Sequence, residues 1–312
     1  METKINIAKF WTRIWALLID SIILGVIGYL LGQTVQDFLV SIGNYGLLFG
    51  LVITVAYQTI FNSKIVNGQT IGKRAMNLQV VDINGDTIDI RKSFLRALIL
   101  CVPYFTANLT IPGLTDISIV DITKTIILAS IAIGVVVIYI FNKQTRQSLH
   151  DLVVGTYVAT TDRNEEPALL PTMTKIPFYV FGGLVTLMFG AEIFTATRKA
   201  PELKNVLSIY SKVSDIDGVL EATVIEKTSY VNDSKTTAYE ANLWVQNLPK
   251  GDLENDKVVR AVVQTILDNA NSIDSFDVIS ISMTREFNIG IASQKSTTTV
   301  RQTPSKWREI LQ

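Results

Sequence analysis

The chain has 312 residues, of which 48% are hydrophobic and 18% are charged, and its mean hydropathy is +0.33. Soluble proteins usually carry about a quarter charged residues, so this composition favours a membrane protein. The 28 basic and 28 acidic residues balance, which gives no electrostatic reason to expect a nucleic-acid partner. Cys101 is the one cysteine and His150 the one histidine. We therefore expect no disulfide, metal site, cofactor or catalytic residues, and no enzyme.

Apolar stretches recur along the chain at lengths near the roughly 20 residues that cross a bilayer core. They cover residues 14–32, 45–61, 94–112, 122–141 and 176–194. The first is predicted to be a retained helix, because no small-residue cleavage site follows it. The third contains Arg96, Pro103 and Asn108, whose polar groups need neighbouring helices or water. We predict about five spans, with a re-entrant third stretch as the alternative.

Basic residues are distributed unevenly between the predicted loops. They occur before the first span and in loops 62–93 and 142–175, whereas loops 33–44 and 113–121 have none. The positive-inside rule then places the N-terminus in the cytoplasm of a bacterial cell and the C-terminal domain outside the plasma membrane. A re-entrant third stretch would put the basic loop 142–175 outside, against this rule.

The first predicted span contains two ionisable residues on one face. Arg13 and Asp20 are seven residues apart, which is about two helical turns. A carboxylate in the middle of a span costs roughly 2.5–3.5 kcal/mol and should find a partner. Asp20 could mark an ion or proton path, or it could belong to a structural ion pair that orients helices. Glycines four residues apart, such as Gly28 and Gly32, predict close helix packing, within the chain or between copies in a homo-oligomer.

Loop 62–93 carries two turn signals. Asn84-Gly85 lies between two short β-prone segments, 78–82 and 87–90, and predicts a type I′ hairpin close to the membrane. Upstream, Gly68, Gly72 and Lys73 sit in the pattern G-x-x-x-G-K-R. This pattern departs in spacing from a phosphate-binding loop and lacks its final Ser or Thr. We interpret it as a tight interfacial turn whose basic residues meet lipid headgroups.

A second polar cluster follows the fourth span. His150-Asp151 comes four residues after Arg146. A histidine beside an aspartate can respond to pH in the physiological range. The same pair could equally serve as a helix cap or as a headgroup contact.

After residue 196 the apolar pattern gives way to segments with polar faces. We predict helices at 203–213 and 252–270, and a last helix that begins with Thr303 as N-cap and Pro304 at its first position. Alternating residues predict strands around 220–224, 239–245, 279–284 and 287–291. The fold class is thus a polytopic α-helical membrane domain plus a small α+β soluble domain. The predicted boundaries are 1–165 for the membrane domain, 166–196 for the linker and fifth span, and 197–312 for the soluble domain.

Three segments together resemble the RDD family of membrane proteins. They are Arg13-x-x-Ala16-x-x-x-Asp20, the segment from Gly68 to Gly85, and Arg146-Gln-Ser-Leu-His150-Asp151 continuing to Val158. The resemblance covers about residues 5–160. The family is named for one Arg and two Asp, which correspond to Arg13, Asp20 and Asp151. The resemblance implies a membrane protein and, for some members, transport or cation/proton exchange.

Two functions from different classes remain open. In the first, Arg13, Asp20 and Asp151 form a charged relay for a transported ion or solute, with His150 and Arg146 beside the path. In the second, the protein is a membrane anchor whose outer domain binds a protein partner. Substituting Asp20 should abolish transport, whereas deleting 197–312 should abolish partner binding. The expected partners are the lipid bilayer, further copies of the chain and an extracytoplasmic protein.

Overall fold

The computed structural model describes residues 5–107, 109, 119–162, 169–199, 203–231, 234–270 and 272–312. The chain divides into two compact units. The first comprises Met1–Thr34, Asn44–Glu192 and Ile289–Ala292, and the second comprises Val35–Gly43, Ile193–Asn288 and Ser293–Gln312. Each unit has its own core, and each is described separately below.

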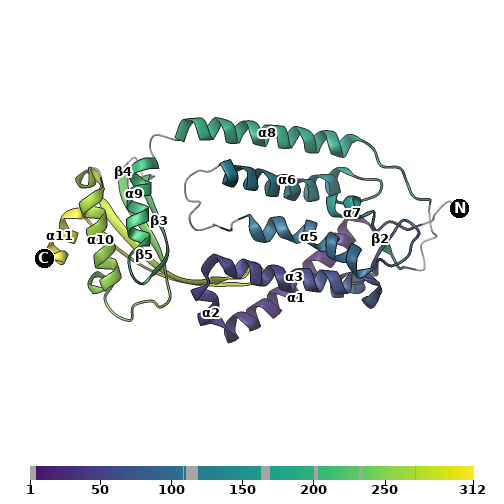
Figure 1. Cartoon of the computed structure of the whole chain (residues 1–312), viewed down its shortest axis with the longest axis horizontal. Coiled ribbons are helices and arrows are strands. Elements are labelled where there is room, and N and C mark those ends of the chain that lie inside the picture. The colour runs from purple at the N-terminus through teal and green to yellow at the C-terminus, as the bar shows by residue number, and fades with distance from the viewer. Residues whose placement is uncertain are drawn as a thin grey trace. The chain divides into compact units, whose positions relative to one another are not determined.

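Apolar helices make up most of the first unit. They are α1 (Phe10–Thr34), α3 (Gly46–Phe61), α5 (Ile90–Thr106), α6 (Ile119–Phe141) and α8 (Ile176–Lys199). Within this unit α3 packs on α5, and α5 packs on α6 (Figure 1). The short helix α2 (Gln36–Ser41) follows α1 in the chain.

Three of these helices are long and apolar enough to cross a membrane within the described part of the chain. They cover Phe10–Thr34, Gly43–Phe61 and Thr123–Phe141. The predicted third span corresponds to α5, which has 17 residues and contains Pro103. The predicted fifth span corresponds to α8, where the described apolar portion is the shorter Ile176–Ala191. A membrane-helix region is therefore confirmed, and the count of about five spans stays a prediction.

Helix α1 buries one face and exposes the others. Its buried residues are Ala16, Asp20, Leu24, Gly28 and Gly32, which recur every four positions. Such spacing puts them on one face of the helix. Large apolar side chains on its other faces are exposed, including Leu17, Ile22 and Leu30. An outward surface of this kind suits lipid rather than water.

Short elements close one end of the helix bundle. They are α4 (Ile71–Ala75), β1 (Leu78–Val81), α7 (Leu149–Val154) and β2 (Tyr157–Thr160). Strands β1 and β2 pair antiparallel, with Leu78 opposite Thr160 and Val81 opposite Tyr157. The pairing joins the loop that contains α4 to the segment that follows α7.

The prediction of a hairpin around Asn84-Gly85 is wrong, because segments 78–82 and 87–90 do not pair as two strands. A turn forms, with Gly85 at φ +87° and the Gly85 amide donating to the Asp82 carbonyl, but it is not the predicted type I′ turn, because Asn84 does not have a positive φ. Only one bridge follows, between Val81 and Thr87, because Asp89 caps helix α5 immediately afterwards. Strand β1 therefore pairs with β2, whose first residue, Tyr157, comes 79 positions after Leu78, the first residue of β1.

The second unit contains a four-stranded sheet with helices on one face. Besides α2, its main elements in chain order are α9 (Leu203–Ser214), β3 (Val219–Val231), β4 (Ser234–Val245), α10 (Lys257–Asn269), β5 (Val278–Asn288), β6 (Ser293–Gln302) and α11 (Pro304–Leu311). The strand order is β3-β4-β5-β6, with β4 and β5 parallel and the outer pairs antiparallel. The predicted element order is thus present in the structure.

Its core forms where one face of the sheet meets the three helices. Ala241 of β4, Ile281 of β5 and Trp307 of α11 are fully buried there. Asp256 caps α10 by accepting from the Val258 and Val259 amides, and Thr303 caps α11 with Pro304 next to it. The predicted cap of the last helix is confirmed.

The position predicted for the fourth strand is wrong. Strand β5 continues to Asn288, the chain turns at Gly290 with φ +76°, and β6 begins at Ser293. Strand β6 is rich in Ser and Thr, and its side chains are almost all exposed. It carries no alternation of apolar residues, so the periodicity that reveals half-buried strands is absent.

Candidate functional site

The carboxylate of Asp20 is buried where α1 passes α4. Its Oδ1 accepts hydrogen bonds from the Tyr57 hydroxyl at 2.7 Å and the Gly72 amide at 2.8 Å. Its Oδ2 accepts from the Thr70 hydroxyl at 2.6 Å. All three donors are neutral, and two of them belong to the start of α4. Asp20 therefore anchors the loop before α4 to the first membrane helix.

Gly72 allows this anchoring because its backbone lies directly against α1. A Cβ atom at this position would lie 2.1 Å from the Ala16 carbonyl oxygen and 2.9 Å from the Asp20 carboxylate. No side chain fits at such distances. Gly68, nearby, adopts φ +67°, and a Cβ there would lie 2.6 Å from the Val80 carbonyl oxygen. Both glycines serve close approaches of the backbone, as the interpretation of an interfacial turn expects.

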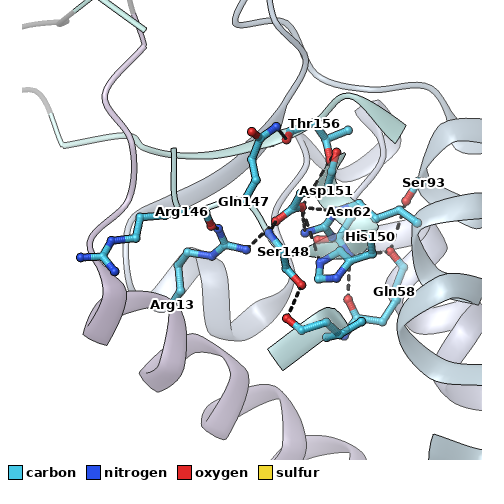
Figure 2. A network of polar contacts seen from close by, with 12 residues as sticks. Arg13, Gln58, Asn62, Ser93, Arg146, Gln147, Ser148, His150, Asp151 and Thr156 are labelled. Carbon is cyan, nitrogen blue, oxygen red and sulfur yellow. Dashed lines mark hydrogen bonds and ion pairs between the residues drawn. The ribbon is translucent and has the colours of Figure 1, made fainter. Parts of the chain in front are cut away.

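A second buried carboxylate, Asp151, lies at the start of α7 and joins three helices. Its Oδ2 accepts from Arg13 Nη2 of α1 at 2.8 Å and from the Ser148 amide at 3.2 Å. Its Oδ1 accepts from Arg96 of α5, through Nη2 at 2.7 Å and Nε at 3.0 Å. Figure 2 shows Arg13 and Asp151 directed toward each other, whereas the Arg146 guanidinium points away from Asp151. Arg146 contributes its carbonyl oxygen, which accepts from Arg13 Nη1.

Electrostatics fix the charge states in this second cluster. Burial alone would raise the pKa of Asp151, but Arg96, His150 and Arg13 hold it well below its usual value. Burial lowers the pKa of His150 to about 3, with Arg96 and Arg13 adding to the shift and Asp151 opposing it. His150 is therefore neutral at physiological pH. This disfavours the pH-responsive pair and favours the helix-start role for Asp151.

A cavity of about 270 Å³ is lined by Asp20 and by the two arginines that pair with Asp151. Its polar wall is formed by ionisable side chains from four elements, namely Arg13, Asp20, Lys73, Arg96 and His150. The remaining wall is largely apolar and comes mainly from α1 and α6, including Ile14, Leu17, Val136 and Ile140. The cavity is thus lined on its polar wall by ionisable side chains and elsewhere by apolar side chains of α1 and α6.

Lys73 is the member of this set without a close counter-ion. Its Nζ lies 3.4 Å from the Thr70 hydroxyl, and no ion pair of Lys73 occurs in the described part of the chain. Burial, followed by repulsion from Arg96, lowers the pKa of Lys73 to about 7, although Asp20 and Asp151 act in the opposite direction. An ammonium group with this pKa gains and loses its proton near neutral pH.

The predicted relay of Arg13, Asp20 and Asp151 is only partly assembled. Arg13 contacts Asp151 directly, whereas Asp20 takes its hydrogen bonds from Tyr57, Thr70 and Gly72. Lys73 interacts electrostatically with both carboxylates, because Asp20 and Asp151 each raise its pKa. Sequence reasoning placed Lys73 at headgroups and treated Arg96 as a weakness of the third span. A positive residue inside an apolar stretch was the signal that could have identified Arg96 as the second partner of Asp151.

Buried ionic clusters inside a bundle of apolar helices define the N-terminal part as a helical membrane domain. The model of the RDD family matches residues 7–155. The N-terminal region therefore belongs to the RDD family, and the predicted resemblance is confirmed, while the rest of the chain is unassigned. No curated protein and no solved structure matches the chain. The residues that the structure describes contain no group of three or more His, Cys, Asp or Glu that could hold a metal ion.

Proposed function

We propose that the N-terminal domain binds and moves a small ion or solute across the membrane, and that the charged cavity is its binding point. The observation that carries this proposal is the set of five ionisable side chains on one cavity wall within an apolar bundle. Ionisable groups in such surroundings are costly, and they are found mainly where they line pathways or form required pairs. Arg13 and Arg96 form required ion pairs with Asp151. Lys73 has no such pair among the described residues, so we assign it to the pathway.

The charges around the cavity predict how ion binding is coupled to protonation of Lys73. Arg13 and Arg96 offset Asp151 and Asp20 in number, so the cluster is neutral when Lys73 is neutral and carries one positive charge when Lys73 is protonated. A bound anion would stabilise the protonated form, and a bound cation would stabilise the neutral form. By linkage, a proton would travel with an anion or exchange against a cation.

This geometry favours an anion. Both guanidinium groups lie at the cavity wall, and the oxygens of Asp20 already accept three hydrogen bonds. Cation/proton exchange, which the family resemblance implies for some members, would need Asp20 to give up one of these donors. With few spans in the domain, a continuous path would form in a homo-oligomer. We place the protein in a bacterial plasma membrane with its N-terminus in the cytoplasm.

Flux in proteoliposomes tests this proposal. Lys73→Gln removes the proton-binding group without breaking an ion pair, so flux across an anion and cation panel under a pH gradient should fall by about tenfold or more. The matched control is Lys143→Gln, because Lys143 is exposed and does not line the cavity. Equal flux through wild type and Lys73→Gln for every ion would contradict the proposal.

A membrane-anchored interaction protein is the second candidate. The sheet of the second unit ends in strands β3 and β6, and β6 is exposed along nearly its whole length. Unpaired sheet edges can accept a strand from a partner protein. Deletion of residues 197–312 distinguishes the transport proposal from the interaction proposal. The transport proposal expects flux to survive the deletion, and the interaction proposal expects co-purification of an extracytoplasmic partner to be lost.

A further inference from the structure

We propose that the cavity holds the phosphate headgroup of an anionic membrane lipid, whose acyl chains run along the apolar faces of α1 and α6. This inference rests on the proposal that the cavity is the ligand site, and it names the ligand class. Three independent features support it, namely the depth of the cavity, the chemistry of its walls and its charge.

The cavity lies at the level where headgroups are found. Arg13 is near the start of α1, Ile140 is near the end of α6, and Arg96 lies in the first half of α5, so all three lie toward the same end of the bundle. At that end α1 exposes Trp11 and Trp15, which are 67% and 53% accessible. Exposed tryptophans at a helix end are typical of the membrane–water interface. A headgroup at this depth would reach the charged wall without entering the bilayer core.

The walls suit an amphiphile better than a free ion. Leu17 of α1 and Val136 and Ile140 of α6 line the cavity and are also exposed at the surface of the first unit. The cavity therefore opens along side chains that face acyl chains in a membrane. A water-soluble ion gains nothing from these apolar walls, whereas a lipid buries its glycerol and upper chain atoms against them.

The polar wall of the cavity carries one positive charge that no acidic side chain balances when Lys73 is protonated, so it can bind one negative charge. Arg13 and Arg96 each contact Asp151, so the excess positive charge rests on Lys73. Among the described residues, its ammonium group donates one hydrogen bond, the 3.4 Å contact with the Thr70 hydroxyl. His150 lines the cavity, is 6% exposed, and its buried Nδ1 has no hydrogen-bond partner among the described residues. A headgroup hydroxyl could donate to this nitrogen while the phosphate meets Lys73. Phosphatidylglycerol carries both groups.

Several titratable or charged groups act on Lys73 or share its cavity wall. They are Asp20 and Arg13 of α1, Arg96 of α5, Asp151 and His150 of α7, and Tyr139 of α6. His150, whose pKa is lowered to about 3 by burial, stays uncharged at neutral pH. A bound phosphate would therefore add the one new charge, raise the pKa of Lys73 above about 7 and bring a proton onto it.

Calorimetric titration of the full-length protein in neutral detergent tests this. The ligands are short-chain phosphatidylglycerol, phosphatidylcholine with the same chains, and glycerol 3-phosphate as a headgroup without chains. We expect phosphatidylglycerol to bind at least about tenfold more tightly than either other ligand. Titrations at about pH 8 in two buffers of different ionisation enthalpy should show proton uptake on binding. Lys73→Gln should lose both the preference and the uptake, while Lys143→Gln keeps them.

The outcomes separate this inference from the proposed function. Equal affinity for the two lipids, unchanged binding by Lys73→Gln, or equal losses in both lysine variants would overturn lipid recognition by the cavity. Glycerol 3-phosphate binding as tightly as the lipid would identify a free phosphate as the ligand, and the lipid inference fails. Proteoliposome flux that survives any of these results leaves the transport proposal standing. Lipid binding without flux leaves the headgroup site and removes the transport proposal.

Discussion

At the scale of single residues, the two buried aspartates of the membrane domain, Asp20 and Asp151, differ in their partners. Asp151 neutralises two buried guanidinium groups, whereas Asp20 receives hydrogen bonds from a phenol, a hydroxyl and an amide. We therefore expect the negative charge to matter more at Asp151 than at Asp20. The difference is invisible in the sequence, because both are aspartates in or beside an apolar stretch.

Substitution of each aspartate by asparagine should separate these roles. Asp151→Asn leaves Arg13 and Arg96 buried without a counter-ion and should cost about 3–5 kcal/mol of unfolding free energy. Asp20→Asn keeps one acceptor oxygen and should cost about 1–3 kcal/mol. Thermal unfolding in detergent measures both, with the exposed Asp86→Asn as control, for which a change within about 0.5 kcal/mol is expected. The opposite ranking would contradict the assignment of Asp151 as the ionic centre.

At the scale of elements, the position of α4 depends on a close contact with α1. This five-residue helix is too short to be stable alone, and it is held by Thr70 at its N-cap, by the Asp20 carboxylate and by the absence of a Cβ at Gly72. Lys73 reaches the cavity only because α4 is held in this position. The geometry of the proposed binding site thus depends on one glycine.

Replacing Gly72 by alanine should therefore disturb both stability and the site. The added Cβ would lie 2.1 Å from the Ala16 carbonyl oxygen, and overpacking of this kind costs about 1–3 kcal/mol. Gly182→Ala in α8 is the matched control, since nothing lies within 4 Å of its added Cβ. There the higher helix propensity of alanine should leave stability unchanged or slightly raised. Similar unfolding temperatures for both variants would show that α4 does not rest on α1 as described.

At the scale of the whole molecule, an RDD-family membrane domain and a sheet-rich domain share one chain. Each has its own core, with the buried cluster of the second unit built from the sheet and from α9, α10 and α11. The distribution of basic residues predicts that residues 197–312 lie outside the cytoplasm, on the opposite side of the membrane from loops 62–93 and 142–175.

Cysteine labelling in intact cells can establish this orientation. Cys101 is the one cysteine and is buried, so Cys101→Ser provides a background for single cysteines at exposed positions. We expect Asp268→Cys to react with a membrane-impermeant maleimide from outside. Asn84→Cys, in the loop of β1, should react only after the membrane is opened. Labelling of both from the same side would disprove the predicted five-span topology.

The sequence by itself determined the features that local pattern encodes. Apolar length identified the three helices that are long enough to cross a membrane in the described part of the chain. Alternation and capping residues identified most elements of the second unit, and three motifs identified the family. Strand β6 was missed because its exposed, Ser/Thr-rich residues leave no periodic signal.

Only the tertiary structure decided which charges meet. The sequence grouped Arg13, Asp20 and Asp151 in one relay. In the structure Asp151 pairs with Arg13 and also with Arg96, whereas Asp20 accepts hydrogen bonds from Thr70 and Gly72 at the start of α4. The structure also brings Lys73 to the cavity and pairs β1 with β2 instead of the segment after Asn84-Gly85. These are contacts between residues far apart in the chain, and they are set by packing of whole helices, which no local spacing records.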